Sequence, residues 1–484
     1  MEHGYTVGQI RAAEARAMAA DRTGDALMQR AAAGLAAVVL RLLRPDRALH
    51  AFGGGRRGGV YGARVLLVVG SGNNGGDALF AGARLAARGV AVTAWRAGSG
   101  VHEAGWRAFR SAGGREVDAE GALAGLAGQR LVVDAVAGIG SRPGLAAPVA
   151  DLAEACAATG VPVVAADLPS GLAPEPPFVE SAHFAAVVTV TFGGLKLCQL
   201  VEPAASACGR VELVDLGLDL PLPAVSRWDR SDLAAAWPVP DATSDKYSRG
   251  VVGIDAGSTD YPGAGVLAVA GAVGAGAGMV RCLAPEAVAT RVVERFPNVV
   301  TSPGRVQAHV LGPGWGPRPD GAARVAAAVA SGLPLVLDAD AIGHLRQGRP
   351  GVVLTPHAGE LARLLGLERS EVETDPLGAV RRAVAETGCT VLLKGATQFV
   401  CGPQEDRVWL GLPGPAWTAQ AGSGDVLAGA CGALLAAGLP PVRAALAAAG
   451  LQALTAARHP GPLPPQALAE RFNDSIQGFA QTWC

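Results

Sequence analysis

The 484-residue chain has few aromatic side chains, few charges and no excess of either sign. Aromatic residues make up 5% of it and charged residues 17%, and 41 Lys and Arg stand against 42 Asp and Glu, for a formal net charge of -1. A chain without a basic excess lacks the electrostatic footprint of proteins that bind nucleic acid or acidic membrane surfaces. We therefore expect no nucleic-acid partner.

Cysteine pairs and long apolar runs are missing as well. The 8 cysteines include no CxxC pair, so buried free thiols are a better interpretation than a disulfide framework or a zinc site. Gly, Pro and Arg break the alanine-rich runs before they reach the roughly 20 residues that a membrane span needs. The first residues are charged and amphipathic rather than signal-like. We expect a cytoplasmic protein without a membrane span, and a homo-oligomer is compatible with the sequence.

The chain is rich in small and aliphatic residues, with 50% hydrophobic residues and 67 glycines. At this length two or three domains are expected, and a Pro-rich stretch from Leu218 to Asp241 places a boundary near Val225. After a helical start over residues 6 to 43 and a Gly/Arg-rich loop over 52 to 62, continuous apolar strands alternate with helices. The pattern predicts two doubly wound α/β domains, residues 1–222 and 226–484.

Three strand ends of the first domain carry polar side chains. SGNNGGD, Ser71 to Asp77, is expected to be a turn after one strand, Asp134 ends a second, and Asp167 and Ser170 follow a third. The carboxyl ends of parallel strands meet at one edge of a sheet, where such folds bind ligands. Carboxylate, amide and hydroxyl oxygens together suit a hard cation. We expect one ligand site there, although each Asp by itself could form a turn.

The stretch AGSGDVLAG, Ala421 to Gly429, predicts an anion-binding turn at the start of an apolar helix. Gly422 and Gly424 allow a tight turn, and free N–H groups at a helix start attract phosphate. A carboxylate beside bound phosphate is repelled by that phosphate. Asp425 is therefore better suited to accept a proton than to bind the ligand. The other interpretation, an ordinary helix cap, stays open.

Two further polar residues follow strands of the second domain. Lys394 stands at a strand end next to a glycine, where we expect it to face an anionic ligand. His357 lies between a strand and a helix, as a turn residue or as part of the same rim as Asp425 and Lys394.

In this order, NNGGD, VVDAVAGIG, DLPSG and TFGGLKLCQL resemble the epimerase domain of the bifunctional NAD(P)H-hydrate repair enzymes, over about residues 5 to 218. The resemblance implies a Rossmann-like domain that interconverts the R and S epimers of NADHX and NADPHX, the hydrated cofactors, at C6. Asp167 is the candidate proton-handling group, with Lys196 as a second. The implied potassium ligands are Asn74, Asp134 and Ser170. The implied substrate contacts are Asn73, Asn74, Gly75, Gly76, Asp77, Gly138, Ile139, Gly140, Ser141, Arg142, Pro143, Gly144 and Asp167.

YPGA, GPGWG, TPHAGE, LLKGATQ and AGSGDVLAG resemble the ribokinase-like dehydratase domain of the same enzymes, over about residues 226 to 484. The resemblance implies that ADP, with Mg2+, drives dehydration of the S epimer to NAD(P)H and leaves AMP and phosphate. Asp425 is the candidate catalytic residue. The implied contacts are Ala264, Gly314, His357 and Asp425 for the hydrated nucleotide, and Lys394, Gly395, Ala396, Thr397, Gln398 and Gly424 for the adenylate. The competing hypothesis is a ribokinase-superfamily kinase of small molecules with a non-catalytic N-terminal binding domain.

Overall fold

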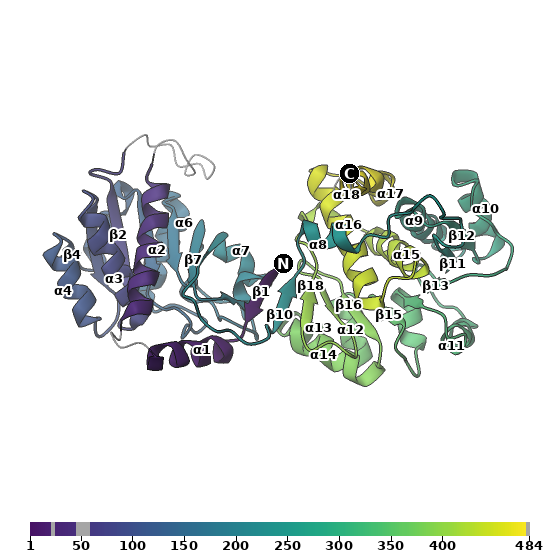
Figure 1. The fold of residues 1–484 in the computed structure, drawn as a ribbon, viewed down its shortest axis with the longest axis horizontal. Coiled ribbons are helices and arrows are strands. Elements are labelled where there is room, and N and C mark those ends of the chain that lie inside the picture. Colours follow the sequence, from purple (N-terminus) through teal and green to yellow (C-terminus); the bar gives the residue numbers. More distant parts are fainter. Residues whose placement is uncertain (21–24, 45–58, 481–484) are drawn as a thin grey trace. The chain divides into compact units, whose positions relative to one another are not determined.

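The computed structural model describes residues 1–20, 25–44 and 59–480, which form two compact units (Figure 1). One unit is His3–Ala224, and the other is Val225–Cys484 together with Met1–Glu2, so the first two residues group with the C-terminal unit. Most of the loop expected over residues 52 to 62 lies outside the described residues. No helix in the described part of the chain is long and apolar enough to cross a membrane.

The N-terminal unit is built on a sheet of seven strands in the order β4-β3-β2-β5-β6-β7-β9. All neighbouring pairs are parallel. The strands are β2 Arg64–Val69, β3 Ala91–Arg96, β4 Arg115–Val117, β5 Leu131–Ala135, β6 Val163–Ala166, β7 Val188–Phe192 and β9 Arg210–Val214. Apart from this sheet, Gly4 and Tyr5 of β1 (Glu2–Tyr5) pair in parallel with β8 (Leu195–Lys196).

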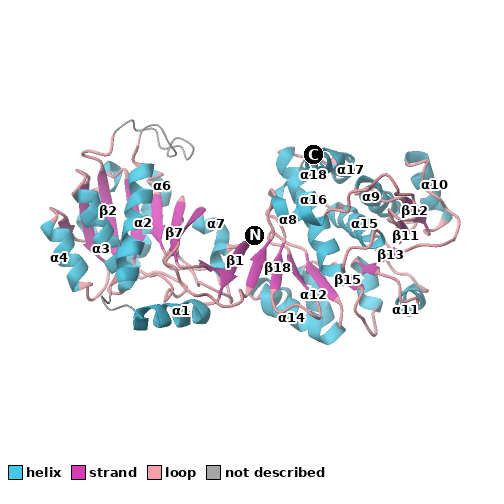
Figure 2. Cartoon of the chain, in the orientation of Figure 1, coloured by secondary structure: helices cyan, strands magenta, loops and turns pink. Residues whose placement is uncertain are grey.

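Helices cover both faces of this sheet (Figure 2). Because side chains alternate along a strand, Val65 and Leu67 join a core with α2 and α3, while Leu66 and Val68 join one with α5 and α6. The stretch expected to be helical over 6–43 forms two helices, and α3 begins at Asn73, so most of the expected SGNNGGD turn is the first turn of a helix. The helices are α1 Val7–Ala20, α2 Ala26–Leu42, α3 Asn73–Ala86, α4 Glu103–Ser111, α5 Ala119–Ala124, α6 Ala147–Thr159 and α7 Ala204–Cys208.

The sheet of the C-terminal unit runs β12-β11-β13-β14-β15-β16-β17-β18-β10. It is parallel from β12 to β16, whereas β17 is antiparallel to both β16 and β18. The strands are β10 Val225–Arg227, β11 Val251–Asp255, β12 Met279–Cys282, β13 Ala308–Leu311, β14 Leu335–Leu337, β15 Val352–Leu354, β16 Thr390–Leu393, β17 Phe399–Cys401 and β18 Val408–Leu410. The α/β class with parallel sheets in two domains is thus confirmed.

Helices α9 and α15 pack so closely in this unit that only glycine fits at their contact. A Cβ on Gly271 would lie 2.0 Å from the carbonyl oxygen of Val426, and one on Gly429 would lie 1.8 Å from that of Ala268. This contact sets the position of the helix start that carries Asp425. The helices are α8 Arg230–Ala236, α9 Pro262–Gly274, α10 Glu286–Arg295, α11 Gly321–Ala330, α12 Ala358–Leu365, α13 Arg369–Thr374, α14 Pro376–Thr387, α15 Ser423–Ala436, α16 Pro441–Arg458, α17 Pro465–Glu470 and α18 Phe472–Ala480.

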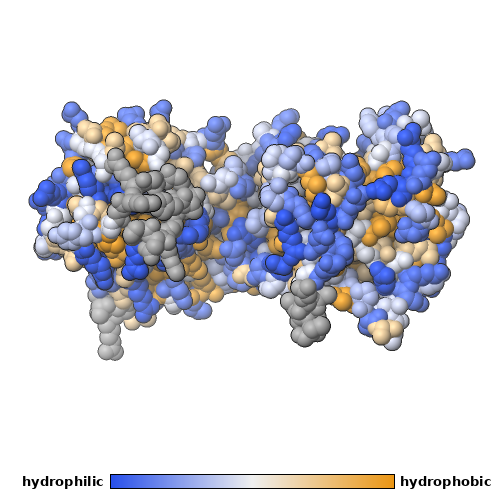
Figure 3. Space-filling view, turned by 90° about the horizontal axis from the view of Figure 1, so that it is seen from above, coloured by the Kyte–Doolittle hydropathy of each residue, from blue (hydrophilic) through white to orange (hydrophobic). Residues whose placement is uncertain are grey.

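The cysteines and the surface agree with the composition. Hydrophilic side chains cover much of the face drawn in Figure 3, with apolar ones interspersed. Seven cysteines of the described residues are free and buried, as expected: Cys156, Cys198, Cys208, Cys282, Cys389, Cys401 and Cys431.

Candidate active sites

The N-terminal sheet changes direction between β2 and β5. From β2 the chain adds β3 and β4 on one side and then returns to place β5 on the other, and such switch points open a crevice at the carboxyl ends of the strands. The Gly70 N–H donates to the carbonyl of Ala135 at 3.0 Å. A Cβ on Gly70 would lie 1.9 Å from the carbonyl oxygen of Val136, so glycine is required for this close approach.

Residues from three strand ends meet in this crevice. Asn74, in the first turn of α3, donates from Nδ2 to the carbonyl of Ala166 at 3.1 Å. Its Oδ1 is buried and has no hydrogen-bond partner among the residues that the structure describes. The position that a Cβ would take on Gly138 lies 2.8 Å from Asp167 Oδ2 and 3.3 Å from Asn74 Oδ1. The side chains of Asn74 and Asp167 therefore both face the Gly138 backbone.

Asp134 and Ser170 form a buried pair beside these residues. The Ser170 hydroxyl donates to Asp134 Oδ1 at 2.6 Å, and its backbone N–H donates to Oδ2 at 2.7 Å. The Asp134 side chain is fully buried, and burial raises the pKa of its carboxyl to about 6 although the bonds from Ser170 and Val136 oppose the rise. The carboxylate is therefore fixed at the base of the crevice.

Asp167 and Lys196 are held together by a buried ion pair. Asp167 has a left-handed backbone with φ of 70°, a conformation that is rare for a residue with a Cβ and often found at functional sites. Lys196 is 1% exposed and also donates to Thr191 Oγ1 at 2.9 Å and to the carbonyl of Phe192 at 3.0 Å. Gln199 Nε2 donates to the Asp167 carbonyl at 2.6 Å. The ammonium group thus donates to Asp167, Thr191 and Phe192, which uses all three of its N–H donors.

Two further carboxyl groups lie near this pair. Burial, reinforced by the charges of Asp167 and Glu14, raises the pKa of Asp77 to about 8. Burial also raises the pKa of Glu14, which belongs to α1 and is half-buried, against the opposing effect of Lys196. Sequence reasoning missed Glu14, because a single glutamate on an amphipathic helix carries no signal of its own.

The loop from Gly138 to Gly144 forms the rim of the crevice. Gly144 N–H donates to the carbonyl of Gly171 at 3.0 Å, and the Gly171 N–H donates to Ser141 Oγ at 3.3 Å. Arg142 in this loop is exposed. The loop is therefore tied to the strand end that carries Asp167 and Ser170.

In the C-terminal unit, α15 begins with the predicted anion-binding turn. Gly422 is the N-cap with φ of 91°, and no side chain caps the helix. Asp425 lies in the first turn and is half-buried, and its carboxylate has no hydrogen-bond or ion-pair partner in the described part of the chain. The helix-cap interpretation of Asp425 is therefore wrong. Burial, helped by the charge of Asp338 and opposed by Lys394, raises the pKa of Asp425 to about 7.

Lys394 faces this turn. Its Nζ lies 3.1 Å from the position that a Cβ would take on Gly424. It donates to Asp338 Oδ1 at 2.7 Å and lies 3.9 Å from Glu360 Oε2. Burial alone would lower the pKa of Lys394, but these carboxylates raise it, so the cation persists beside the turn.

Sequence reasoning missed Asp338 and Thr355, which hold this lysine in place. Asp338 directly follows β14 and is 2% exposed, and Thr355 Oγ1 donates to its Oδ1 at 2.7 Å. The rule that strand ends carry the site, applied to the strand end in PLVLDADAI, would have found Asp338.

His357 is the N-cap of α12. Its Nδ1 accepts hydrogen bonds from the N–H groups of Gly359 at 3.0 Å and Glu360 at 3.2 Å, and the ring is more than half exposed. Its backbone forms a parallel bridge with Lys394. The turn-residue interpretation describes this geometry, and the bridge also brings His357 next to Lys394.

The remaining predicted residues lie in two groups. Gly314 has φ of 62°, and a Cβ on it would lie 2.3 Å from that of Ala264, so these two are neighbours. Residues 395–398 join β16 to β17, with Gly395 and Ala396 exposed. Gln398 Oε1 is buried without a hydrogen-bond partner in the described ranges of the chain.

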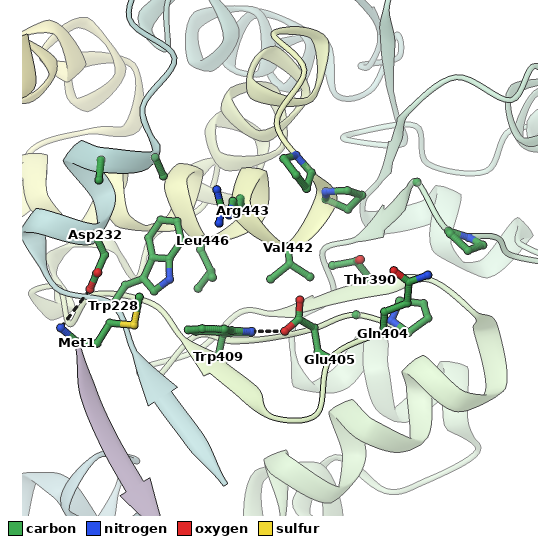
Figure 4. A pocket seen from close by; sticks show the side chains of 18 residues that line it. Met1, Trp228, Asp232, Thr390, Gln404, Glu405, Trp409, Val442, Arg443 and Leu446 are labelled. Atoms are coloured by element: carbon green, nitrogen blue, oxygen red, sulfur yellow. Dashed lines mark hydrogen bonds and ion pairs between the residues drawn. The ribbon is translucent and has the colours of Figure 1, made fainter. Parts of the chain in front are cut away.

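A separate cavity of about 440 Å³ in the C-terminal unit lies away from these residues (Figure 4). Thr390, the first residue of β16, and Gly351, which precedes β15, line it. Lys394 and Thr355 follow the opposite ends of the same strands. The cavity is therefore not the predicted site.

Both units place carboxylates at the carboxyl ends of parallel strands, beside glycine-rich turns at helix starts, which is the arrangement of α/β enzymes that act on nucleotides. The family model described as NAD(P)H-hydrate dehydratase matches residues 252–473, and the one described as YjeF-related protein N-terminus matches residues 24–198. The chain belongs to the family of bifunctional NAD(P)H-hydrate repair enzymes.

Relatives with that name match along most of their length. The one from Mycobacterium leprae is 43% identical over 494 residues, covering 99% of each chain, and the one from Mycobacterium tuberculosis is 43% identical over 458 residues, covering 92% of this chain and 91% of the relative. A solved ADP/ATP-dependent NAD(P)H-hydrate dehydratase from Bacillus subtilis, co-crystallised with ATP and Mg2+, is 26% identical, with a TM-score of 0.49 over 53% of this chain and 99% of that one.

Proposed function

We propose that the chain repairs hydrated nicotinamide cofactors in the cytoplasm. The N-terminal unit interconverts the R and S epimers of NADHX and NADPHX, and the C-terminal unit dehydrates the S epimer to NADH or NADPH at the expense of ADP. Family membership supports both activities. The single observation that carries the dehydratase proposal is Asp425, a half-buried carboxylate without a hydrogen-bond partner in the described residues, in the first turn of a glycine-capped helix that faces Lys394.

The proposed dehydration makes a good leaving group from a poor one. Asp425 takes the proton of the C6 hydroxyl while the hydroxyl oxygen attacks the terminal phosphorus of ADP, so that AMP leaves and a phosphate ester forms. The ring nitrogen lone pair then expels phosphate, and loss of the C5 proton restores the double bond of NAD(P)H. The N–H groups of Gly422 to Gly424 and the Lys394 ammonium stabilise charge on the phosphoryl group.

The position of Lys394 explains how it serves this step. The carboxylates of Asp338 and Glu360 lie 2.7 Å and 3.9 Å from its ammonium nitrogen, and the backbone of Gly424 is close to the same nitrogen. Because Gly424 has no side chain, the charge remains open toward the turn. In this proposal His357, Ala264 and Gly314 contact the hydrated nucleotide, and the loop 395–398 contacts the adenylate.

For the epimerase we propose Asp167 as the group that handles the proton. Its Oδ1 is paired with Lys196, whereas Oδ2 faces Gly138 in the crevice. Lys196 would then orient the Asp167 side chain through their ion pair rather than exchange a proton itself. The segments Asn73 to Asp77 and Gly138 to Gly144 would contact the substrate.

Potassium fits the base of this crevice. Asn74 Oδ1 is buried with no hydrogen-bond partner, and such an orphaned oxygen is a natural ligand for a hard cation. Asn74, Asp134 and Ser170 would hold the ion, whose charge would fix the strand ends around the substrate. We expect epimer exchange to slow when sodium or tetramethylammonium replaces potassium; equal rates in all three salts would contradict this ligand set.

Magnesium would reach the dehydratase with ADP. No group of three or more His, Cys, Asp or Glu side chains in the described residues could hold a metal ion. Mg2+ commonly binds through substrate phosphates and few protein ligands, and when bound it would neutralise phosphate charge.

The deciding experiment uses chemically hydrated NADH containing both epimers. The full chain with ADP, Mg2+ and K+ should restore the absorbance of reduced nicotinamide from both epimers and release AMP and phosphate in equal amounts. The competing kinase hypothesis predicts a phosphorylated product and no reduced nicotinamide. Without ADP, only epimer exchange should remain.

A further inference from the structure

Helix α1 is tied to other segments of the N-terminal unit by hydrogen bonds. The Val7 N–H donates to Glu175 Oε2 at 2.9 Å. Farther along the helix, Gln9 Nε2 donates to the Leu222 carbonyl at 2.8 Å and Arg16 Nη2 to the Asp219 carbonyl at 2.7 Å. With Ile10 buried in addition, the helix has a fixed rotation about its own axis.

That rotation turns Arg11 and Glu14 toward the predicted epimerase site. These residues are three apart and therefore share one face of the helix. Glu14 lies close enough to Lys196 and Asp167 for their charges to act on its pKa, and its own charge acts on the pKa of Asp77. Arg11 Nη2 lies 3.5 Å from the position that a Cβ would take on Gly140, in the rim loop. One helical face thus reaches both the inside and the mouth of the crevice.

The guanidinium group of Arg11 is available for a ligand. The side chain is exposed, and in the described part of the chain it has neither a hydrogen bond nor an ion pair within 4 Å. Lys196, Arg11 and Arg142 differ in whether they are free to bind a ligand. Lys196 is already in an ion pair with Asp167, whereas the side chains of Arg11 and Arg142 are exposed.

An anionic substrate requires a positive charge at the edge of this site. The crevice contains the carboxylates of Asp134 and Asp167, and a dinucleotide carries a diphosphate that these carboxylates would repel. A planar guanidinium binds phosphate oxygens through two parallel hydrogen bonds. A cation at the mouth would hold the diphosphate there and leave the uncharged hydrated ring to enter among the carboxylates.

We propose that Arg11 is a substrate-binding residue of the epimerase site, which takes the diphosphate of the hydrated dinucleotide at the mouth of the crevice beside Gly140. This inference rests on the proposed epimerase function and adds α1 to the elements that form the site. Arg11 binds and positions the substrate and takes no part in the proton transfer.

The test compares Arg11→Met with the wild-type full chain in epimer exchange without ADP, followed by NMR or chromatography. The methionine keeps the aliphatic stem and removes the charge. With NADPHX, KM should rise about tenfold, the loss typical of one charge-assisted hydrogen bond, while kcat stays within about twofold. Arg107→Met, on an exposed position of α4, is the matched control and should leave KM unchanged.

A substrate without phosphate separates binding from a structural role. With hydrated reduced nicotinamide riboside, wild type and Arg11→Met should have the same kcat/KM, because the group that Arg11 contacts is missing. An equal loss on both substrates, a fall in kcat, or an unchanged KM for NADPHX would each overturn the assignment. A wild-type chain that exchanges neither substrate would instead contradict the proposed epimerase function and remove the inference with it.

Discussion

The pKa values of single side chains in this protein depend on burial and on neighbours that are distant in the sequence. Asp425 and Asp134 are both acids at or near strand and helix ends, yet the pKa of the first is raised to about 7 and that of the second to about 6. Ser170 and Val136 donate hydrogen bonds to Asp134, and these bonds favour its ionised form against the effect of burial. Asp425 has no such donors in the described residues, which leaves it able to take up a proton near neutral pH.

Asp425→Asn should lower kcat for dehydration by roughly 10²- to 10⁴-fold, the usual contribution of a general base. ADP binding, measured by calorimetry, should persist because the N–H groups of the turn remain. The base acts in its ionised form, so wild-type kcat/KM should rise as pH increases through about 7. A variant with near-normal turnover, or a profile that falls over this range, would refute the role of Asp425.

Asp77 should destabilise the N-terminal unit at alkaline pH. Its pKa is raised from 3.8 to about 8 in the folded protein, so between these values the folded state binds the extra proton and stability decreases as pH rises. Asp77→Asn should therefore increase the free energy of unfolding by about 1 kcal/mol or more at pH 8 and by little near pH 3, roughly one unit below the unfolded pKa. Thermal denaturation at both pH values measures this, with Asp151→Asn, an exposed change on α6, as the control.

At the scale of elements, the starts of helices carry much of both sites, and the packing of those helices decides where the sites lie. The first turn of α3 brings Asn74 to the N-terminal site, and the first turn of α15 brings Asp425 to the C-terminal one. The α9–α15 contact allows no side chain at Gly271 or Gly429. The distance between α9 and α15 therefore depends on glycine, which has no side chain, at these two positions.

Gly271→Ala tests this contact. A Cβ there would lie 2.0 Å from the backbone oxygen of Val426, so the helices must separate, at a cost of about 1–3 kcal/mol. Calorimetry should show a lower melting temperature for the C-terminal unit, and dehydration should slow as α15 shifts. Gly263→Ala on the same helix meets nothing within 4 Å, and it should leave the melting temperature unchanged or raise it slightly.

At the scale of the whole molecule, two activities on one chain are expected to clear both epimers. Each unit has its own hydrophobic core and its own predicted site. If the S epimer passes between them through solution, each site should work without the other on the same chain.

Two single-site variants provide the test. With both epimers and ADP present, Asp167→Asn should restore the S epimer rapidly and the R epimer only slowly, whereas Asp425→Asn should interconvert the epimers without forming NADH. A mixture of the two variants should restore both epimers at rates set by the enzyme concentration. A mixture that converts no more than Asp167→Asn alone would show that both sites must be on one chain.

The local sequence determined much of this protein. Alternating strands and helices, polar residues at strand ends and glycines at helix starts are features of neighbouring residues, so the α/β class of both units and the crowding of Asn74, Asp134 and Asp167 could be predicted. Asp338 was within reach of the same rule. The length of the turn before α3 could not be predicted, because the residue at which a helix starts depends on which backbone N–H groups lack a partner in the folded protein.

Only the tertiary structure decided what each charge does. Glu14 and Arg11 reach the crevice because bonds from Val7, Gln9 and Arg16 fix the rotation of α1. Asp338 holds Lys394, 56 residues away in the chain, and the raised pKa of Asp425 comes from burial. These effects depend on distances in space and on the exclusion of solvent, and neither can be read from the spacing of residues along the chain. The fold class, by contrast, follows from the periodicity of apolar residues, which the sequence shows directly.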